Sequence, residues 1–298
     1  MALPIRIVRR KTERGRVLCF ALLSAVAVFA CACAAASRPP DAAGPRSSGE
    51  PVYATLMDRA DRREVALNAW ANLARSQGIN NAPQPELQPI TATLKSIPPL
   101  NPPLYLPKVG AAPVMTEEET REALRRFITD QVTLIGAEPK QLSLVLRTDL
   151  ADGMKKAKYE QHPFRYPLRG GYGILEITFA PDRRVLQLTS TCIPEVEQLQ
   201  KTLAASAPTL NAEQVAANVK GRQFTYTDVR GNQQTYTVGA GDEVNVRELV
   251  IYPIERAGEP GALELHLAWE VFIGNGPTAR IIYLDALANK IIADNAST

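Results

Sequence analysis

The residues that could do acid–base or metal chemistry are few, because the chain of 298 residues contains two histidines, His162 and His266. A zinc hydrolase needs several His, Cys or carboxylate ligands that converge on the metal, and no HExxH motif is present. The GxSxG pattern of acyl transfer and the GxxxxGKS/T and GxGxxG phosphate loops are absent as well. We therefore predict a non-catalytic protein with no catalytic residues, no metal site and no cofactor.

His266 lies in a stretch of alternating character, residues 263–273, which is typical of a β-strand. Apolar side chains at every second position define one face of this strand, namely Leu263, Leu265, Leu267, Trp269, Val271 and Ile273. Glu264, His266 and Glu270 fall on the opposite face, so we expect a sheet with one buried and one wetter side. These three polar residues are a candidate protein-binding surface, and a solvated charged face without a partner is the simpler alternative.

Most of the positive charge lies in the N-terminal segment. Residues 1–16 contain six Lys or Arg and one Glu, whereas the whole chain has a formal net charge of +3. The remainder is slightly acidic, which argues against a nucleic-acid-binding protein. An apolar run that ends in small residues follows, so residues 1–33 are interpreted as a signal or lipoprotein-type segment of an exported protein. A retained membrane anchor is the alternative, because about 20 apolar residues can span a bilayer.

Four cysteines are present, Cys19, Cys31, Cys33 and Cys192, and the first lies within the signal segment, so no disulfide framework is expected. The stretch VFAC, which ends at Cys31, resembles a bacterial lipobox, and Cys33 is a second candidate for acylation. Acylation of either cysteine would anchor the protein in the bacterial cell envelope. Cys192 could pair with Cys33, but burial as a small apolar residue is the expectation that we favour.

The region between this segment and the regular part of the chain divides into three pieces. Residues 34–54 are interpreted as a linker, and an apolar stripe among charged residues predicts an amphipathic helix over residues 55–79. Nine prolines then exclude a long helix or a central strand over residues 80–113. We expect this Pro-rich segment to be extended and either to wrap a surface or to link modules.

Two similar cycles of helix and strands follow. In the first, residues 114–200, Thr116 is placed to cap a helix, and four strand patterns come after it. In the second, residues 205–294, Asn211 is placed to cap a short helix ahead of a hairpin and further alternating strands. Asp285, at the end of a strand before a turn, is expected to bond local backbone amides.

This order of elements predicts the α+β fold class, with two consecutive modules in which a helix packs on an antiparallel sheet. The modules are preceded by the signal segment, the amphipathic helix and the Pro-rich extended segment.

Over about 180 residues, the two modules resemble the propeptide region of thermolysin-type and fungalysin-type metalloproteases. The first is similar to the fungalysin/thermolysin propeptide module through the stretch DLADGMKKAKYEQ, the glycines at 170–171 and the APDRRV turn. The second is similar to a PepSY module through AEQVAANV, ELVIYPI, LAWEV and ARIIYLDALANKII. The family commonly has Thr-Gly in the closing turn where this chain has Ala288 and Asn289, and Asn tolerates a left-handed backbone. The catalytic domain of those proteases has no counterpart in this sequence.

The resemblance implies a binding role in trans, by which the protein inhibits a secreted metallopeptidase or assists its folding. The rival hypothesis is an envelope lipoprotein with a structural or assembly role and no protease partner. A third reading is a sensor with a pocket for a small molecule or peptide between the two modules. In the first two hypotheses the protein is exported and held at the membrane by a lipid anchor or an uncleaved N-terminal segment, and nucleic acid is not a partner.

Overall fold

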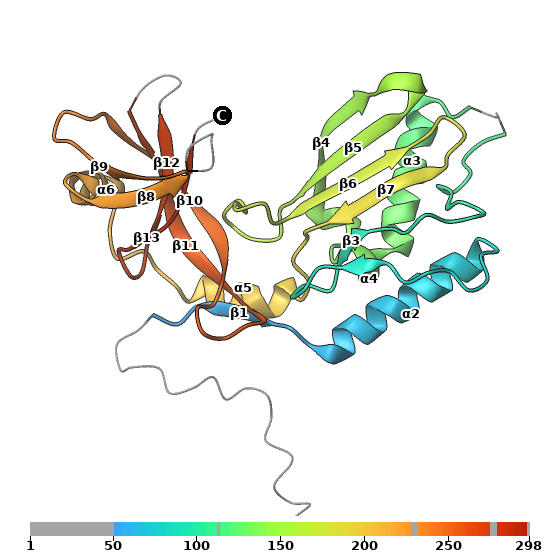
Figure 1. The fold of residues 1–298 in the computed structure, drawn as a ribbon, viewed down its shortest axis with the longest axis horizontal. Helices are drawn as coiled ribbons and strands as arrows, with labels where there is room; N and C mark the ends of the chain where they lie inside the picture. Colours follow the sequence, from blue (N-terminus) through green and yellow to red (C-terminus); the bar gives the residue numbers. More distant parts are fainter. Residues whose placement is uncertain (1–50, 112–113, 228–231, 275–278, 297–298) are drawn as a thin grey trace, which may run out of the picture. The chain divides into compact units, whose positions relative to one another are not determined.

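The computed structural model describes residues 51–111, 114–227, 232–274 and 279–296, and Pro51–Thr298 form one compact unit (Figure 1). Within it, helices pack on antiparallel sheets, so the predicted α+β class is confirmed. No helix of these described ranges is long and apolar enough to cross a membrane. The segment of residues 1–33, with its two candidate acylation sites, and most of the linker of residues 34–54 lie outside the described residues.

The first module consists of a helix on one face of a four-stranded antiparallel sheet. The chain order is α3 (Glu117–Asp130), the short α4 (Val132–Ile135), β4 (Leu142–Asp149), β5 (Lys155–Gln161), β6 (Ile174–Phe179) and β7 (Val185–Ser190), and the strands pair in this order. The Thr116 hydroxyl accepts the N–H of Glu119, and the Glu119 carboxylate accepts the N–H of Thr116, so this helix starts in a capping box. Apolar side chains of α3 and of the inner face of the sheet form one core, which includes Leu124, Phe127, Ile128, Ala157, Leu175, Ile177 and Leu188.

The N-terminal part of the described chain differs from the helix expected over residues 55–79. Residues Ala54–Met57 form a strand, β1, and the helix α2 runs from Ala60 to Ser76. The strand forms because the edge of another strand is available for pairing: β1 pairs antiparallel with the start of β11 (Ala262–Ile273). β1 thus belongs to the sheet of the second module, whereas α2 places Trp70 and Leu73 in the core of the first. The segment is a strap that joins the two modules.

The Pro-rich segment packs against the first module along much of its length. It contains the short strands β2 (Glu86–Leu87) and β3 (Leu94–Ser96), and it buries Leu94, Leu104 and Leu106 in the first core. Backbone hydrogen bonds from Val185 to Leu104 (2.8 Å) and from Leu106 to Arg183 (2.9 Å) fix it beside β7. An extended segment with few backbone donors of its own is thereby held by an existing strand.

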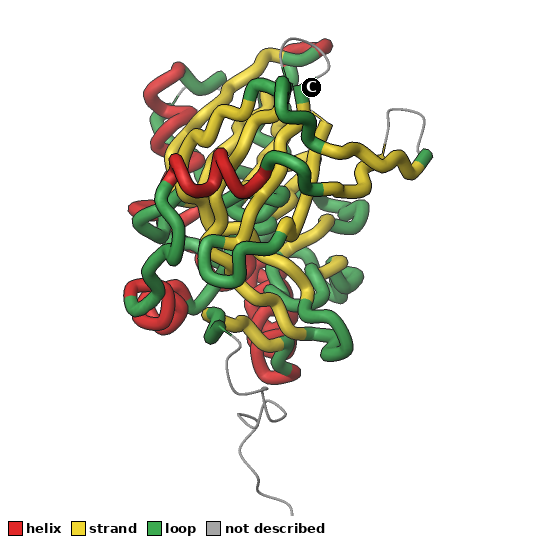
Figure 2. The backbone as a smooth tube through the Cα atoms, turned by 90° about the vertical axis from the view of Figure 1, so that its left-hand side faces the viewer, coloured by secondary structure: helices red, strands yellow, loops and turns green. Residues whose placement is uncertain are grey.

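The second module is built around the long central strand β11. The strand β10 (Val244–Glu255) pairs along one edge of β11, while β1 and β12 (Arg280–Asp285) share the other edge, and β13 (Ile291–Ala296) pairs with β12. Helix α6 (Ala212–Val219), capped by Asn211, crosses this sheet, and Figure 2 shows it from the side on which it lies. A hairpin of β8 (Gln223–Thr227) and β9 (Gln233–Thr237) follows α6.

A helix that the sequence analysis did not predict, α5 (Val196–Ala204), connects the modules and packs on β1 and β11. A second connection is the loop of residues 162–173, between β5 and β6. Its residue Leu168 forms a parallel bridge with Ile251 of β10, through hydrogen bonds from Arg169 to Ile251 (3.0 Å) and from Ile251 to Pro167 (2.8 Å). The loop also contributes four apolar side chains to the core around α5, namely Phe164, Tyr166, Leu168 and Tyr172.

Candidate functional site

The expected wetter face of β11 is not exposed. Glu264, His266 and Glu270 have exposed fractions of 9%, 8% and 5%, so the prediction of a solvated surface there is wrong. The alternation of β11 itself is as expected, but segments distant in the sequence cover its polar face: Tyr53 lies over His266, and Arg169 reaches Glu270. That these three residues contact another protein stays a prediction.

His266 is held on three sides. Its Nδ1 lies 2.6 Å from an Asp285 carboxylate oxygen, its Nε2 lies 3.6 Å from Glu264, and the Tyr53 ring centroid is 3.9 Å from that of the imidazole. Asp285 also accepts the backbone N–H groups of Leu287 (2.8 Å) and Ala288 (2.6 Å), which confirms the expected local bonding. Burial opposes ionisation of Asp285, but the contact with His266 and the two N–H groups outweigh it and lower the pKa of Asp285.

Of the histidines and the cysteine that the structure describes, His266 and Cys192 are buried and His162 is exposed. Both nitrogens of His266 face carboxylates, while His162 is exposed in the loop after β5, so the two histidines belong to different modules. Cys192 is fully buried as expected, and burial raises the pKa of its thiol to about 11, which keeps it protonated near neutral pH. No group of three or more His, Cys, Asp or Glu in the part of the chain that the structure describes is arranged to hold a metal ion.

Glu270 is the buried end of an ionic contact between the modules. Its carboxylate accepts a hydrogen bond from Arg169 Nε (2.9 Å) and lies 3.4 Å from the Tyr283 hydroxyl, and Arg169 Nη2 also pairs with Glu248 (2.9 Å). The Glu270 side chain is 7% exposed and that of Arg169 is 32% exposed. Arg169 therefore neutralises a carboxylate that has little access to water.

An open cleft lies elsewhere, where the starts of α2 and α5 meet the end of α4. Its volume is about 600 Å³, within the range of ligand pockets in proteins. Ionic side chains from three separate segments line it, namely Arg59, Asp61, Arg62, Glu138, Glu195 and Glu197. Apolar side chains lie among them, namely Val65, Val132, Ala137, Pro194 and Val196.

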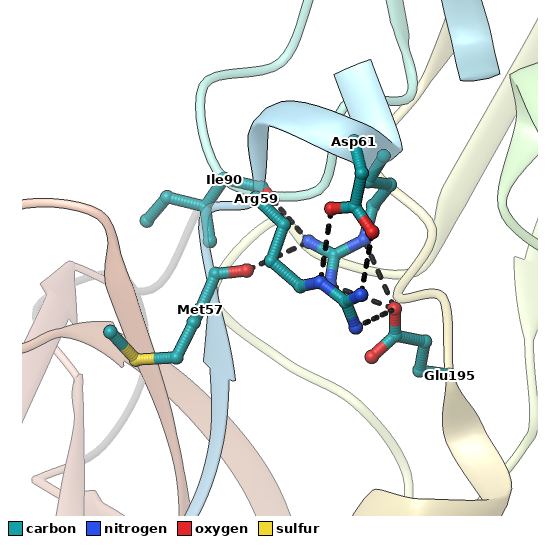
Figure 3. Close-up of polar contacts among 6 residues, drawn as sticks. Met57, Arg59, Asp61, Ile90 and Glu195 are labelled. Carbon is teal, nitrogen blue, oxygen red and sulfur yellow. Dashed lines mark hydrogen bonds and ion pairs between the residues drawn. The ribbon is translucent and has the colours of Figure 1, made fainter. Parts of the chain in front are cut away.

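Two arginines at the start of α2 are bound by carboxylates in this cleft (Figure 3). Arg62 donates from Nη1 to the backbone carbonyls of Met57 (2.8 Å) and Ile90 (2.9 Å), and its Nη2 lies 2.9 Å from Glu195. Arg59 forms a bidentate contact with Asp61, at 2.6 and 3.1 Å, and this contact lowers the pKa of the Asp61 carboxyl. Arg62, whose side chain is 13% exposed, is therefore a structural clamp between β1, the Pro-rich segment and α5.

Glu195 has an unusual backbone conformation. It precedes α5 with φ 56° and ψ 33°, in the left-handed region, which costs a residue with a Cβ about 1–2 kcal/mol. Such strain persists only where the surroundings determine it, and it is concentrated at functional sites. Here Arg62 and Arg59 hold the side chain, so the link between the modules has a fixed geometry at the edge of the cleft.

No motif in the sequence marks Arg59, Arg62 or Glu195 as functional residues. The two arginines lie in the stretch DRADRREV, where alternating charges are typical of the solvated side of a helix. Arg62 and Glu195 are 133 residues apart, and no local pattern indicates that they meet. The proposed acylation sites Cys31 and Cys33 lie outside the described residues, and their acylation stays a prediction.

No protein-family model matches this chain, and no curated protein matches it. Among solved structures, it is similar to the Bacillus megaterium YpeB C-terminal domain, with 9% sequence identity and a TM-score of 0.29. That match covers 80% of this chain and 97% of the other. A likeness at this TM-score assigns neither a fold nor a function to the chain.

Proposed function

We propose that this chain is an exported, non-catalytic binding protein that acts in trans on a secreted metallopeptidase, as an inhibitor or as an aid to its folding. The observation that supports this best is the open cleft, which offers a binding surface lined by ionic and apolar side chains. Its lining contains arginines, carboxylates and apolar side chains but no histidine, cysteine or serine. The lowered pKa of Asp61 also suits an ion pair better than a general acid.

The class of partner comes from the resemblance of the two modules to a protease propeptide region. A propeptide joined to its enzyme benefits from a high local concentration, so a weak contact suffices. A module that acts in trans needs a genuine interface, or an anchor that keeps both proteins at one membrane. The proposed lipid at Cys31 or Cys33 would supply such an anchor.

The test is a titration of a secreted metallopeptidase from the same cells with the purified mature protein. We expect peptidase activity, or the yield of active enzyme on refolding, to change with the added protein and to level off near equimolar amounts. A secreted serine peptidase from the same culture is the control and should not respond. Unchanged activity and unchanged refolding at a large excess of the protein would contradict the proposal, and so would repeated turnover of a substrate by the protein alone.

A structural or assembly role in the cell envelope is the second candidate. It is favoured by the strap of β1 and α2, which fastens the two modules together and suits a rigid spacer. Affinity purification of the anchored protein from its native envelope separates the two functions. Envelope proteins without a peptidase would support the spacer, and a metallopeptidase would support the binding role in trans.

A further inference from the structure

The walls of the cleft between α2, α4 and α5 are fixed before any ligand binds. Arg62 ties three segments together at one side, as described above. At another side, Gly136 ends α4 with φ 81°, and a Cβ there would lie 2.5 Å from the Thr93 methyl group, so the turn packs closely against the Pro-rich segment. A preformed site of this kind spends little binding free energy on ordering its own side chains.

Part of the lining is apolar and open to water. Val65 of α2 is 55% exposed although it is a large aliphatic side chain, whereas Val132 is half-buried and Val196 is buried in the wall of the same cleft. Covering such surface releases water and is favourable in proportion to the apolar area. The cleft therefore favours a ligand that has apolar groups.

The charge of the lining also limits which ligands the cleft can bind. Four carboxylates and two arginines line the cleft, which gives a formal excess of two negative charges. Both arginines are already paired with Asp61 and Glu195, and Glu138 pairs with Lys140 at 2.7 Å, so the excess is one negative charge when Lys140 is included. The positive end of α5 does not reverse this sign, because Glu197 lies in its first turn, where a carboxylate offsets the helix dipole. A cationic group is complementary to this lining, and an anionic one is not.

We infer that this cleft binds a short peptide segment of the partner protein in which a basic side chain stands among apolar ones. The volume suits a few residues, the exposed Val65 suits an aliphatic side chain, and the excess of carboxylates suits a Lys or Arg. The inference deepens the proposed function and depends on it for the identity of the partner, but the chemistry of the ligand comes from the cleft alone.

The first experiment measures binding of capped, fluorescently labelled peptides to the mature protein by anisotropy. One peptide contains leucine and lysine, and its matched partner has glutamate in place of each lysine. We expect the lysine peptide to bind about tenfold more tightly than the glutamate peptide. The lysines would form exposed ion pairs with the carboxylates of the cleft, whereas the glutamates would be repelled by them. Equal affinity, or a preference for the glutamate peptide, would overturn the inference.

Variants then place the binding in the cleft. Val65→Lys adds a positive charge to the lining of the cleft. It should therefore lower the affinity for the lysine peptide by about fivefold and raise the affinity for the glutamate peptide. Val145→Lys on β4 is the matched control, because Val145 is a similar side chain, 46% exposed, that does not line the cleft, and it should change neither affinity. A variant that had lost its fold would lose both peptides, so the opposite signs identify an electrostatic effect. Equal effects of the two variants would contradict a site in the cleft.

The native partner distinguishes this inference from the proposed function. If Val65→Lys captures less metallopeptidase from the culture than Val145→Lys does, both the proposed function and the assignment of the cleft hold. If the protein captures the peptidase but Val65→Lys and Val145→Lys do so equally well, the cleft is not the contact site, although the proposed function stands. If the lysine peptide binds as expected and no peptidase is captured, the proposed function fails while the assignment of the cleft stands.

Discussion

The two modules place similar residues on the outer faces of their sheets but give them different surroundings. In the first module, Lys156 and Glu176 form an ion pair at 2.8 Å on neighbouring strands, with side chains 33% and 29% exposed. In the second, Glu270 is 7% exposed and Asp285 is fully buried. The difference arises because the loop of residues 162–173 and Tyr53 cover the second sheet. Whether a charged strand face is a surface thus depends on segments far from it in the sequence.

The surroundings determine how much an ion pair contributes to stability. An exposed pair contributes little, because water and salt screen the charges. A buried carboxylate that loses its partner keeps its desolvation cost without compensation, so removal of one member costs about 3–5 kcal/mol. Removing the charged partner from each sheet should therefore lower the free energy of unfolding by clearly different amounts.

The largest effect is expected for Arg169→Met, which keeps the apolar stem and removes the charge that neutralises Glu270. We expect the free energy of unfolding to fall by about 3 kcal/mol, at the lower end for a buried pair because Arg169 itself is one-third exposed. Urea denaturation monitored by circular dichroism measures it. A loss below about 1 kcal/mol would show that Glu270 is hydrated without Arg169, and the second sheet would then resemble the first.

The next effect is expected for Asp285→Asn. The amide cannot accept the same charge-assisted hydrogen bonds from His266 and the turn, so we expect a loss of about 2 kcal/mol at pH 7. The pKa of Asp285 is lowered in the folded protein, so its contribution is complete above the ordinary value of 3.8 and is lost as the pH falls through the folded pKa. The difference between wild type and variant should accordingly shrink below about pH 4. A difference that is constant from pH 7 to pH 3 would contradict an ionised Asp285.

The elements that the sequence predicts are those that local signals determine. Thr116 and Asn211 cap helices where their side chains can reach the following backbone amides, and four strands follow the first helix as expected. Asn289 has the left-handed backbone, φ 53°, that its turn was expected to tolerate. Each of these features depends on residues close together in the chain.

What the sequence does not reveal depends on distant partners. Residues 54–57 are a strand because β11 offers a free edge, and nothing within DRADRREV or near it indicates that contact. The burial of His266 requires Tyr53, and the cleft requires Arg62 and Glu195 to meet across 133 residues. The periodicity of β11 shows which side chains share a face, but it contains no information about what covers that face.

A smaller effect tests the link between the modules at Glu195. Glu195→Ala and Glu195→Gly both remove the carboxylate that holds Arg62, but glycine adopts the left-handed backbone without a steric cost. We expect the glycine variant to be more stable than the alanine variant by about 1 kcal/mol, after allowance for the greater freedom of glycine in the unfolded chain. Chemical denaturation of the two proteins side by side measures it. An alanine variant of equal or greater stability would mean that the link relaxes to another backbone conformation.

The smallest effect is expected for Lys156→Met, the counterpart of Arg169→Met on the first sheet. The substitution removes the charge that faces Glu176 and keeps the aliphatic stem, so the free energy of unfolding should change by no more than about 0.5 kcal/mol. The small difference should decrease further at high salt, because water reaches both side chains. A loss comparable with that of Arg169→Met would show that the outer face of the first sheet is also shielded in solution. The two sheets would then differ only in what covers their outer faces. A partner protein or a second copy of the chain, bound on the sheet of β4–β7, would be the first candidate to test.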